Sequence, residues 1–144
     1  MGRISVKGFQ YDRLFIPGDT IERDAAGDVT VGYSFIIRYP SYRGTFLSCI
    51  ERFEVAVDGQ EIPEEKLRFC LNGKEFTIPE LRDLHREYWF VLADARIRVV
   101  GDELAPGAHT VKVTMVHRIP YTGYHGDYLI WDNVGEKTMT AGKE

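Results

Sequence analysis

Apolar and polar residues alternate along much of the chain, a pattern typical of β-strands that bury one face. In the segment 27–39 the apolar and aromatic side chains occupy every second position, at Val29, Val31, Tyr33, Phe35, Ile37 and Tyr39. The same period of two recurs in residues 53–57, 67–71, 96–99 and 110–115. Because successive side chains of a strand point to opposite faces, the pattern predicts six or more short strands, each with one face in a core.

Two dipeptides mark sharp reversals between these strands. Asp58-Gly59 ends the extended stretch that begins at Phe46, and Asn72-Gly73 lies in the middle of LRFCLNGKEFTI. Both dipeptides adopt the positive backbone angles that a two-residue hairpin turn requires. The sequence therefore predicts two tight antiparallel hairpins in the middle third of the chain.

Three places interrupt the alternation. Glu51 and Arg52 fall where the pattern slips by one residue, which predicts a β-bulge. The stretch GDTIERDAAG, residues 18–27, is rich in polar residues and glycine and predicts a loop. We expect the tail after Thr138 to be loose.

One short helix is predicted after the second hairpin. Residues 77–80, Thr-Ile-Pro-Glu, have the form of a capping box with proline in the first turn, and Leu81, Leu84 and Tyr88 follow at helical spacing. This helix would span two turns at most. The strand-rich pattern predicts an all-β fold, an antiparallel β-sandwich with one short helix.

Size and composition restrict the fold and the class of partner. A chain of 144 residues with 44% hydrophobic residues predicts a single β-sandwich domain spanning residues 1–144. The net charge is −4, and charges of both signs are interleaved, so neither nucleic acid nor a membrane is favoured as a partner. We expect a cytoplasmic protein in which Cys49 and Cys70 are reduced, buried, small apolar side chains.

Residues that could perform catalysis are sparse in the sequence. The four histidines, His85, His109, His117 and His125, do not have the spacing of a metal site, and His117 falls on the apolar face of a strand. The sequence contains no Gly-rich phosphate loop, GxSxG motif or CxxC pair. We therefore expect neither a catalytic residue nor a metal ligand in this chain.

Two segments combine aromatic rings with glycine and fall outside any clean alternation. They are YPSYRG, residues 39–44, and RIPYTGYHGDYLIWDN, residues 118–133. Amphipathic rings on loops suit a contact surface, but the same rings could equally seal the open ends of the sandwich. The residues predicted to contact a partner or a substrate pocket are Tyr39, Tyr42, Arg43, Tyr121, Tyr124, His125 and Trp131.

Several strings, in one order and at characteristic separations, resemble a known family. They are YRGTFLSCIERFEVAVDG, LRFCLNGKEF, REYW, ARIRV, LAPGAHTV and RIPY. In these strings the chain is similar, over about residues 32–137, to the small (beta) subunit of bacterial C-glycoside deglycosidases. LSCIE and LNGKEF are the more specific strings.

The resemblance implies a β-sandwich that binds a larger alpha subunit, a TIM barrel similar to sugar isomerases and epimerases. It further implies that the alpha subunit holds a divalent metal such as manganese. The pair would cleave the carbon-carbon bond between a sugar and an aromatic aglycone such as a flavonoid, after the sugar has been oxidised to its 3-keto form. In this reading a base removes the C2 proton, the metal stabilises the enolate and the aglycone leaves by elimination.

Two other functions remain open from the residues alone. A stand-alone carbohydrate-binding module would use exposed aromatic rings to stack on sugars. A homo-oligomeric structural sandwich would bury those rings against its own copies. Homo-oligomerisation of the heterodimer is also left open, as are the aglycone and the stoichiometry.

Overall fold

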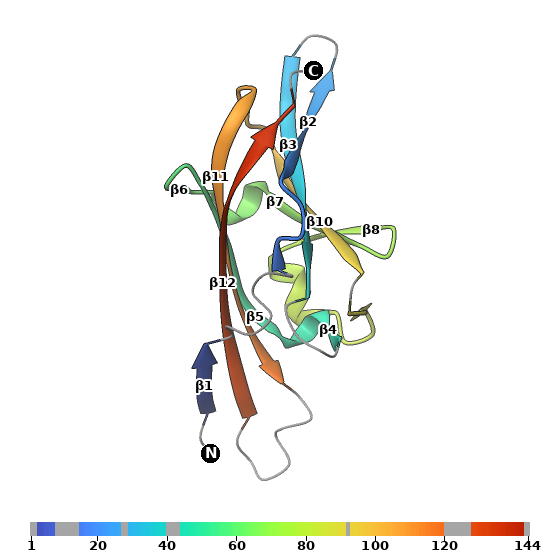
Figure 1. The fold of residues 1–144 in the computed structure, drawn as a ribbon. Helices are drawn as coiled ribbons and strands as arrows, with labels where there is room; N and C mark the ends of the chain where they lie inside the picture. The colour runs from blue at the N-terminus through green and yellow to red at the C-terminus, as the bar shows by residue number, and fades with distance from the viewer. Residues whose placement is uncertain are drawn as a thin grey trace.

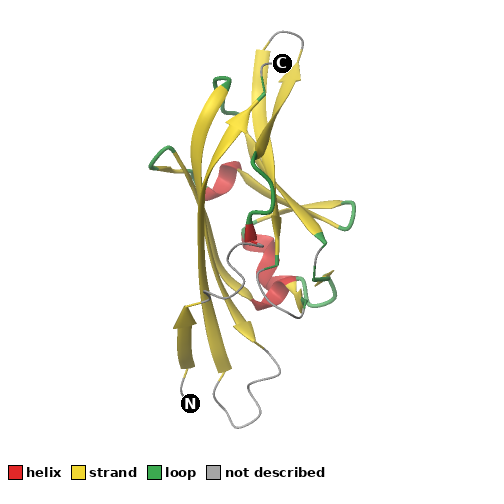
Figure 2. Cartoon of the chain, in the orientation of Figure 1, coloured by secondary structure: helices red, strands yellow, loops and turns green. Residues whose placement is uncertain are grey.

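Strands make up most of the described chain in the computed structural model, which describes residues 3–7, 15–26, 29–39, 44–91, 93–119 and 128–142 (Figures 1 and 2). The strands are β1 Arg3–Lys7, β2 Thr20–Ala26, β3 Val29–Arg38, β4 Thr45–Phe46, β5 Ile50–Val57, β6 Gln60–Glu61, β7 Leu67–Leu71, β8 Lys74–Thr77, β9 Tyr88–Trp89, β10 Asp94–Val100, β11 Gly107–Ile119 and β12 Tyr128–Ala141. The short 3-10 helices are η1 Leu47–Cys49, η2 Glu64–Lys66 and η3 Pro79–Asp83. The predicted all-β class is confirmed.

The strands form two layers, but the layers belong to one sheet. The order is β6-β5-β11-β12-β2-β3-β10-β7-β8, with β1 beside β12, and the short β4–β9 ribbon is separate. The layers join where the end of β12 runs parallel to the start of β2, pairing Thr140 with Thr20 and Ala141 with Ile21. The other described strand pairs are antiparallel, as predicted, and the parallel pairs are this junction and β1–β12. Alternation reports the buried face of a strand, and it carries no information about the direction of its neighbour.

The core lies between the inner faces of these layers, as the alternation predicted. Its strand residues are Tyr33, Phe35, Ile37, Phe53, Val55, Val57, Leu67, Phe69, Leu71, Ile97, Val99, Val111, Val113, Met115 and Met139, all of them buried. Each such aliphatic or aromatic side chain contributes roughly 1.5–3 kcal/mol relative to leaving it exposed. Val31 continues the same alternation but is 46% exposed, because it lies beyond the part of β3 that the other layer covers.

The two hairpins and the bulge are confirmed. Asp58 and Gly59 have φ values of 52° and 83°, and Asn72 and Gly73 have values of 55° and 75°. In the β5–β11 pair, Arg52 is opposite Val116 and Ile50 is opposite His117. Glu51 is the extra residue between them, at the position where the sequence pattern slips.

Two predicted irregular segments are regular strands. Residues 20–26 form β2, with Ile21 fully buried, and β12 continues to Ala141, with Met139 and Ala141 in the core. The predictions of a loop at 18–27 and of a loose tail after Thr138 are therefore wrong. In both segments few apolar residues are spaced among polar ones, so the strand signal is weak without the neighbouring strands.

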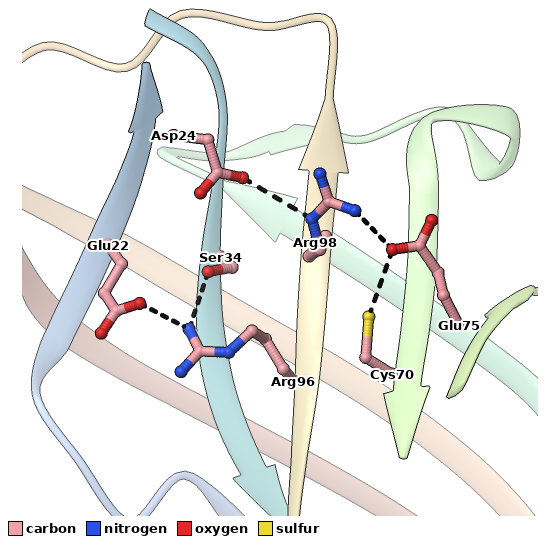
Figure 3. A network of polar contacts seen from close by, with 7 residues as sticks. All are labelled: Glu22, Asp24, Ser34, Cys70, Glu75, Arg96 and Arg98. Carbon is pink, nitrogen blue, oxygen red and sulfur yellow. Dashed lines mark hydrogen bonds and ion pairs between the residues drawn. The ribbon is translucent and has the colours of Figure 1, made fainter. Parts of the chain in front are cut away.

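Charged residues of β2 are part of a network on the outer face of its layer (Figure 3). Arg96 Nη1 donates to Glu22 Oε1 at 2.9 Å and to Ser34 Oγ at 2.8 Å. Arg98 lies between Asp24, at 3.6 Å, and Glu75, to which it donates a hydrogen bond. The charges that make residues 18–27 look like a loop are thus cross-strand partners.

Cys70 belongs to this network, and the prediction that both cysteines are buried is wrong for it. Its thiol is half-buried and donates to Glu75 Oε1 at 3.6 Å, whereas Cys49 is buried. Desolvation, together with the negative charge of Glu75, raises the pKa of the Cys70 thiol to about 11. A thiol with so high a pKa is a poor nucleophile at neutral pH.

The predicted helix is present but shorter than expected. It is the 3-10 helix η3, and Tyr88 lies in strand β9 instead of on the helical face. Glu80 supplies one half of the predicted capping box, since its carboxylate accepts from the Thr77 backbone N–H at 2.6 Å and from the Thr77 hydroxyl at 2.9 Å. Within the described residues, no helix has the length and apolar character needed to cross a membrane.

Candidate functional site

Most of the predicted contact residues lie outside the described part of the chain. These are Tyr42, Arg43, Tyr121, Tyr124 and His125. Trp131 is described only as backbone in β12, where it pairs with Val6 of β1 and His117 of β11. Tyr39 is described and is only 2% exposed. Its burial favours the sealing role for this ring, and its contact with a partner stays a prediction.

Tyr39 contacts His117, so the starting points of the two aromatic segments lie close together. Its ring centroid lies 4.9 Å from that of His117 and 5.3 Å from that of Trp89. Tyr39 directly precedes the segment 40–43, and His117 lies three residues before Pro120. The two segments chosen from composition therefore start from adjacent positions at one end of the core.

Buried polar groups mark this end of the core. His117 is fully buried on the inner face of β11, the face that the sequence pattern assigned to it. Desolvation lowers the pKa of its imidazole to about 3, so the ring is neutral at physiological pH. Asn133, on the inner face of β12, is also fully buried, and neither side-chain amide atom has a hydrogen-bond partner among the described residues. The buried Asn133 amide makes this part of the core costly to form.

Exposed aromatic rings lie beside this end, on the β4–β9 ribbon. We call Phe46, Tyr88, Phe90 and Val91 the aromatic ridge. Phe46 packs edge-on against Tyr88 at 4.9 Å between ring centroids, and Tyr88 packs edge-on against Phe90 at 4.8 Å. Phe46, Phe90 and Val91 are 40%, 62% and 38% exposed. Scattered apolar side chains are common on protein surfaces, whereas exposed rings linked by contacts, with Val91 next to them in the chain, indicate a contact surface.

Strand alternation explains why the three rings of the ridge point outward. In the ribbon, Thr45 pairs with Trp89 and Phe46 with Tyr88. Thr45 and Trp89 are buried at 2% and 0% exposure, so their neighbours must face the other way. The buried Trp89 anchors the ridge because its Nε1 donates to the Ala93 carbonyl at 3.0 Å and its ring packs on the core.

Further hydrogen bonds fix the ribbon from both sides. The Leu47 N–H donates to the Glu87 carbonyl at 2.9 Å, and the Asn72 side-chain amide donates to the Tyr88 carbonyl at 3.0 Å. The Glu87 carboxylate accepts from Asn72 and from Lys74, each at 3.0 Å. These hydrogen bonds lower the pKa of the Glu87 carboxyl, so it is ionised and paired at neutral pH. The ridge is held in place before any partner arrives.

Gly44 lies so close to the ribbon that a side chain at this position would clash with it. A Cβ at Gly44 would lie 2.3 Å from the Trp89 carbonyl oxygen and 3.1 Å from the Phe90 Cα. We expect Gly44→Ala to displace β9 and to lower the free energy of unfolding by about 1–3 kcal/mol in urea titrations. Gly18→Ala is the matched control, because nothing lies within 4 Å of that position. Equal stability of the two variants would contradict this account of the ribbon.

A groove of about 470 Å³ lies on the other side of η1, between β5 and η3. Its charges compensate one another. The Arg118 guanidinium donates to the Ser48 carbonyl at 3.0 Å and approaches Glu51 at 3.4 Å. Arg52 makes two hydrogen bonds to the Glu54 carboxylate, at 2.8 and 3.0 Å. The described part of the chain contains no group of three or more His, Cys, Asp or Glu side chains placed to hold a metal ion.

Comparison with known proteins identifies the family. The family described as C-glycoside deglycosidase beta subunit matches residues 11–121. A 3'-dehydrocarminate deglycosidase beta subunit of Microbacterium sp. is 39% identical over 108 residues, which cover 75% of this chain and 82% of that protein. A C-glycoside deglycosidase beta subunit of Arthrobacter globiformis is 36% identical over 136 residues, covering 92% of this chain and 98% of the relative.

The chain belongs to the C-glycoside deglycosidase beta subunit family. The resemblance found in the sequence is confirmed. A beta subunit of Microbacterium trichothecenolyticum is also 40% identical over 106 residues, covering 73% of this chain and 81% of the relative. The family match contains the whole aromatic ridge, together with Tyr39 and His117.

Sequence reasoning missed the aromatic ridge of this beta subunit. The alternation predicts only a strand at Phe46, and the helical spacing places Tyr88 on the face of a helix. The signal that was available is the string EYWFV, residues 87–91, in which one aromatic residue must be buried while its neighbours face outward. Four aromatic or apolar residues in a row, at 88–91, are unusual for a solvated turn, and this run could have indicated a contact surface.

Proposed function

We propose that the chain is the non-catalytic beta subunit of a heteromeric carbon-carbon lyase that cleaves 3-keto C-glycosides of the flavonoid type. Its partner would be a larger alpha subunit, a TIM barrel similar to sugar isomerases and epimerases. The observation that carries this proposal is the family match, because its members are named as one subunit of a deglycosidase. We further propose a cytoplasmic location for the complex.

The oxidised state of the sugar explains how a carbon-carbon bond can be broken. A C-glycoside has no bridging oxygen for a general acid to protonate, so the usual route with two carboxylates is closed. A ketone at C3 acidifies the proton on C2. Removal of that proton by a base places negative charge on the ketone oxygen. The bond from C1 to the aglycone then breaks, and the aglycone leaves with the electron pair of that bond. Protonation of the aglycone carbon completes the elimination. The name of the Microbacterium relative specifies a 3'-dehydro substrate, which supports this proposal.

The division of labour follows from the side chains present. The described residues of this chain offer no cluster suited to a divalent metal, so we assign the expected manganese-like ion to the alpha subunit. The described histidines do not gather at one place, and the fully buried His117 is neutral. This chain would then bind the alpha subunit and stabilise it, and its aromatic segments would shape the substrate pocket.

Reconstitution tests the proposal. The purified chain is mixed with the sugar-isomerase-like protein encoded beside its gene, and a 3-keto C-glycoside is supplied. We expect a single co-eluting species and at least a tenfold higher rate of aglycone release than with either protein alone. Metal analysis of the separated proteins should find the divalent ion in the alpha subunit. Failure of the two proteins to associate, or full activity of the isolated beta subunit, would refute the proposal.

A further inference from the structure

We propose that the aromatic ridge of Phe46, Tyr88, Phe90 and Val91 is the surface on which the alpha subunit packs. This inference rests on the proposed function, since it names the site through which the beta subunit acts. None of these residues is among those that composition singled out. The argument uses their exposure, the charges around them and the rigidity of the ribbon.

The exposed apolar residues are concentrated at the ridge. The large hydrophobic side chains that are exposed among the described residues are Val31, Phe46, Phe90, Val91 and Val134. Three of these five lie on the β4–β9 ribbon and its extension, and Tyr88 joins them through ring contacts. Val31 and Val134 stand on β3 and β12, apart from the ridge. Interface centres are enriched in aromatic residues that become fully buried on association.

Charged side chains at the border of the ridge form ion pairs with one another. Glu87 is neutralised by Lys74, and Asn72 donates to both the Glu87 carboxylate and the Tyr88 carbonyl. On the neighbouring strands, Arg38 is paired with Asp94 at 2.6 Å. Because these charges are already paired, burying the ridge would leave none of them without a partner. An anionic or cationic small ligand would find no free counter-charge among these groups.

The geometry of the rings favours a protein over a sugar as the partner. Sugars stack on flat ring faces, whereas the ridge is built from edge-to-face pairs with interplanar angles of 79° and 66°. Neighbouring rings therefore do not form a common plane on which successive sugar units could lie. Such a row of edges and faces instead suits the apolar side chains of another protein.

The ridge is close in sequence to the predicted contact residues Tyr42 and Arg43. Gly44, the residue that follows them, lies directly against Trp89 and Phe90. Two positions separate Arg43 from Phe46, the first residue of the ridge. The family match at residues 11–121 includes both.

Binding measurements with the full alpha and beta subunits test the inference. Isothermal titration calorimetry gives the dissociation constant for wild type, Phe90→Ala, the double variant Phe46→Ala/Phe90→Ala and Val91→Glu. We expect Phe90→Ala to weaken association about 30-fold, as buried aromatic anchors at interface centres do, and the other two variants to weaken it further. Val134→Ala and Val31→Ala are matched controls, with similarly exposed side chains elsewhere, and should bind as wild type does.

The outcomes separate this inference from the proposed function. If wild type binds the alpha subunit and all ridge variants bind equally well, the ridge is not the docking site, although the proposed function stands. If wild type itself does not bind, the proposed function fails. Light scattering that shows a wild-type homodimer dissociated by Phe90→Ala would assign the ridge to a second copy of this chain instead. Unchanged circular dichroism and melting temperature in Phe90→Ala show that any loss of binding does not come from unfolding.

Discussion

Replacing Trp89 with alanine should lower the free energy of unfolding by about 3–5 kcal/mol, the range for large-to-small changes at buried aromatic positions. Trp89 is fully buried, and its ring contacts Tyr39 at 5.3 Å and Phe69 at 5.4 Å between centroids. Its Nε1 also donates to the Ala93 carbonyl, which would lose this partner. A loss of this size is a large share of the total stability of a typical domain. Urea unfolding followed by circular dichroism measures it.

The neighbouring aromatic residue supplies the control. Phe90 is 62% exposed, so we expect Phe90→Ala to change stability by no more than about 0.5 kcal/mol. Trp89→Phe should fall between the two, because it keeps a ring in the core but loses the hydrogen bond. Similar losses in Trp89→Ala and Phe90→Ala would show that the ribbon does not divide into a core side and an exposed side.

Acid should destabilise the protein through His117. Burial lowers the pKa of this imidazole from its usual 6.5 to about 3, so between these values the unfolded chain binds a proton that the folded chain does not. Stability is therefore complete above pH 6.5 and is lost progressively as the pH falls toward 3. At pH 4.5 the loss amounts to about 3 kcal/mol, at 1.36 kcal/mol for each pH unit.

The variant His117→Phe removes the titrating group and keeps a ring beside Tyr39. Between pH 7 and pH 4.5, the unfolding free energy of wild type should fall by about 3 kcal/mol more than that of this variant. His85→Gln, which replaces an exposed histidine, is the control variant for the substitution itself. The pair of His109 and Asp58, 2.7 Å apart, acts differently. It raises the pKa of His109, so its contribution is present at low pH and is lost as the pH rises through that pKa.

An NMR titration of the histidine rings decides the matter if His117→Phe does not fold. The ring of His117 should stay neutral at pH 4.5 in the folded protein. Titration of that ring near pH 6.5 in the native state would contradict the burial on which the prediction rests.

The sequence was sufficient for most of the strands because their signals are local. The backbone preferences of Asp58-Gly59 and Asn72-Gly73 are sufficient to predict their turns. The break in the alternation at Glu51 is sufficient to predict the bulge. What it could not predict depends on distant neighbours. β2 is paired with β3, and its Glu22 and Asp24 meet Arg96 and Arg98, which lie 74 residues later in the chain. The alternation of residues in β12 and β2 does not indicate whether these two strands pair parallel or antiparallel.

The candidate site has two sources: composition selected the segments 39–44 and 118–133, and the structure adds the aromatic ridge. The segments that composition selected start at or next to Tyr39 and His117, and the rings of these two residues contact each other. The individual residues were harder to choose, because aromatic rings are equally suited to a core and to an interface. Tyr39 and Trp89 are buried while Tyr88 and Phe90 face outward, and only the pairing of β4 with β9 distinguishes them.

The junction of β12 with β2 has a consequence for biosynthesis. Thr140 pairs with Thr20, about 120 residues earlier in the chain, so the two layers cannot be closed until the last strand has left the ribosome. Closing such a long loop costs entropy before any contact repays it, which makes this step slow in comparison with the local hairpins. Until then the apolar inner faces are open to other chains, and the nascent subunit is most vulnerable to aggregation in this interval. Synthesis alongside a binding partner or a chaperone would shorten that exposure.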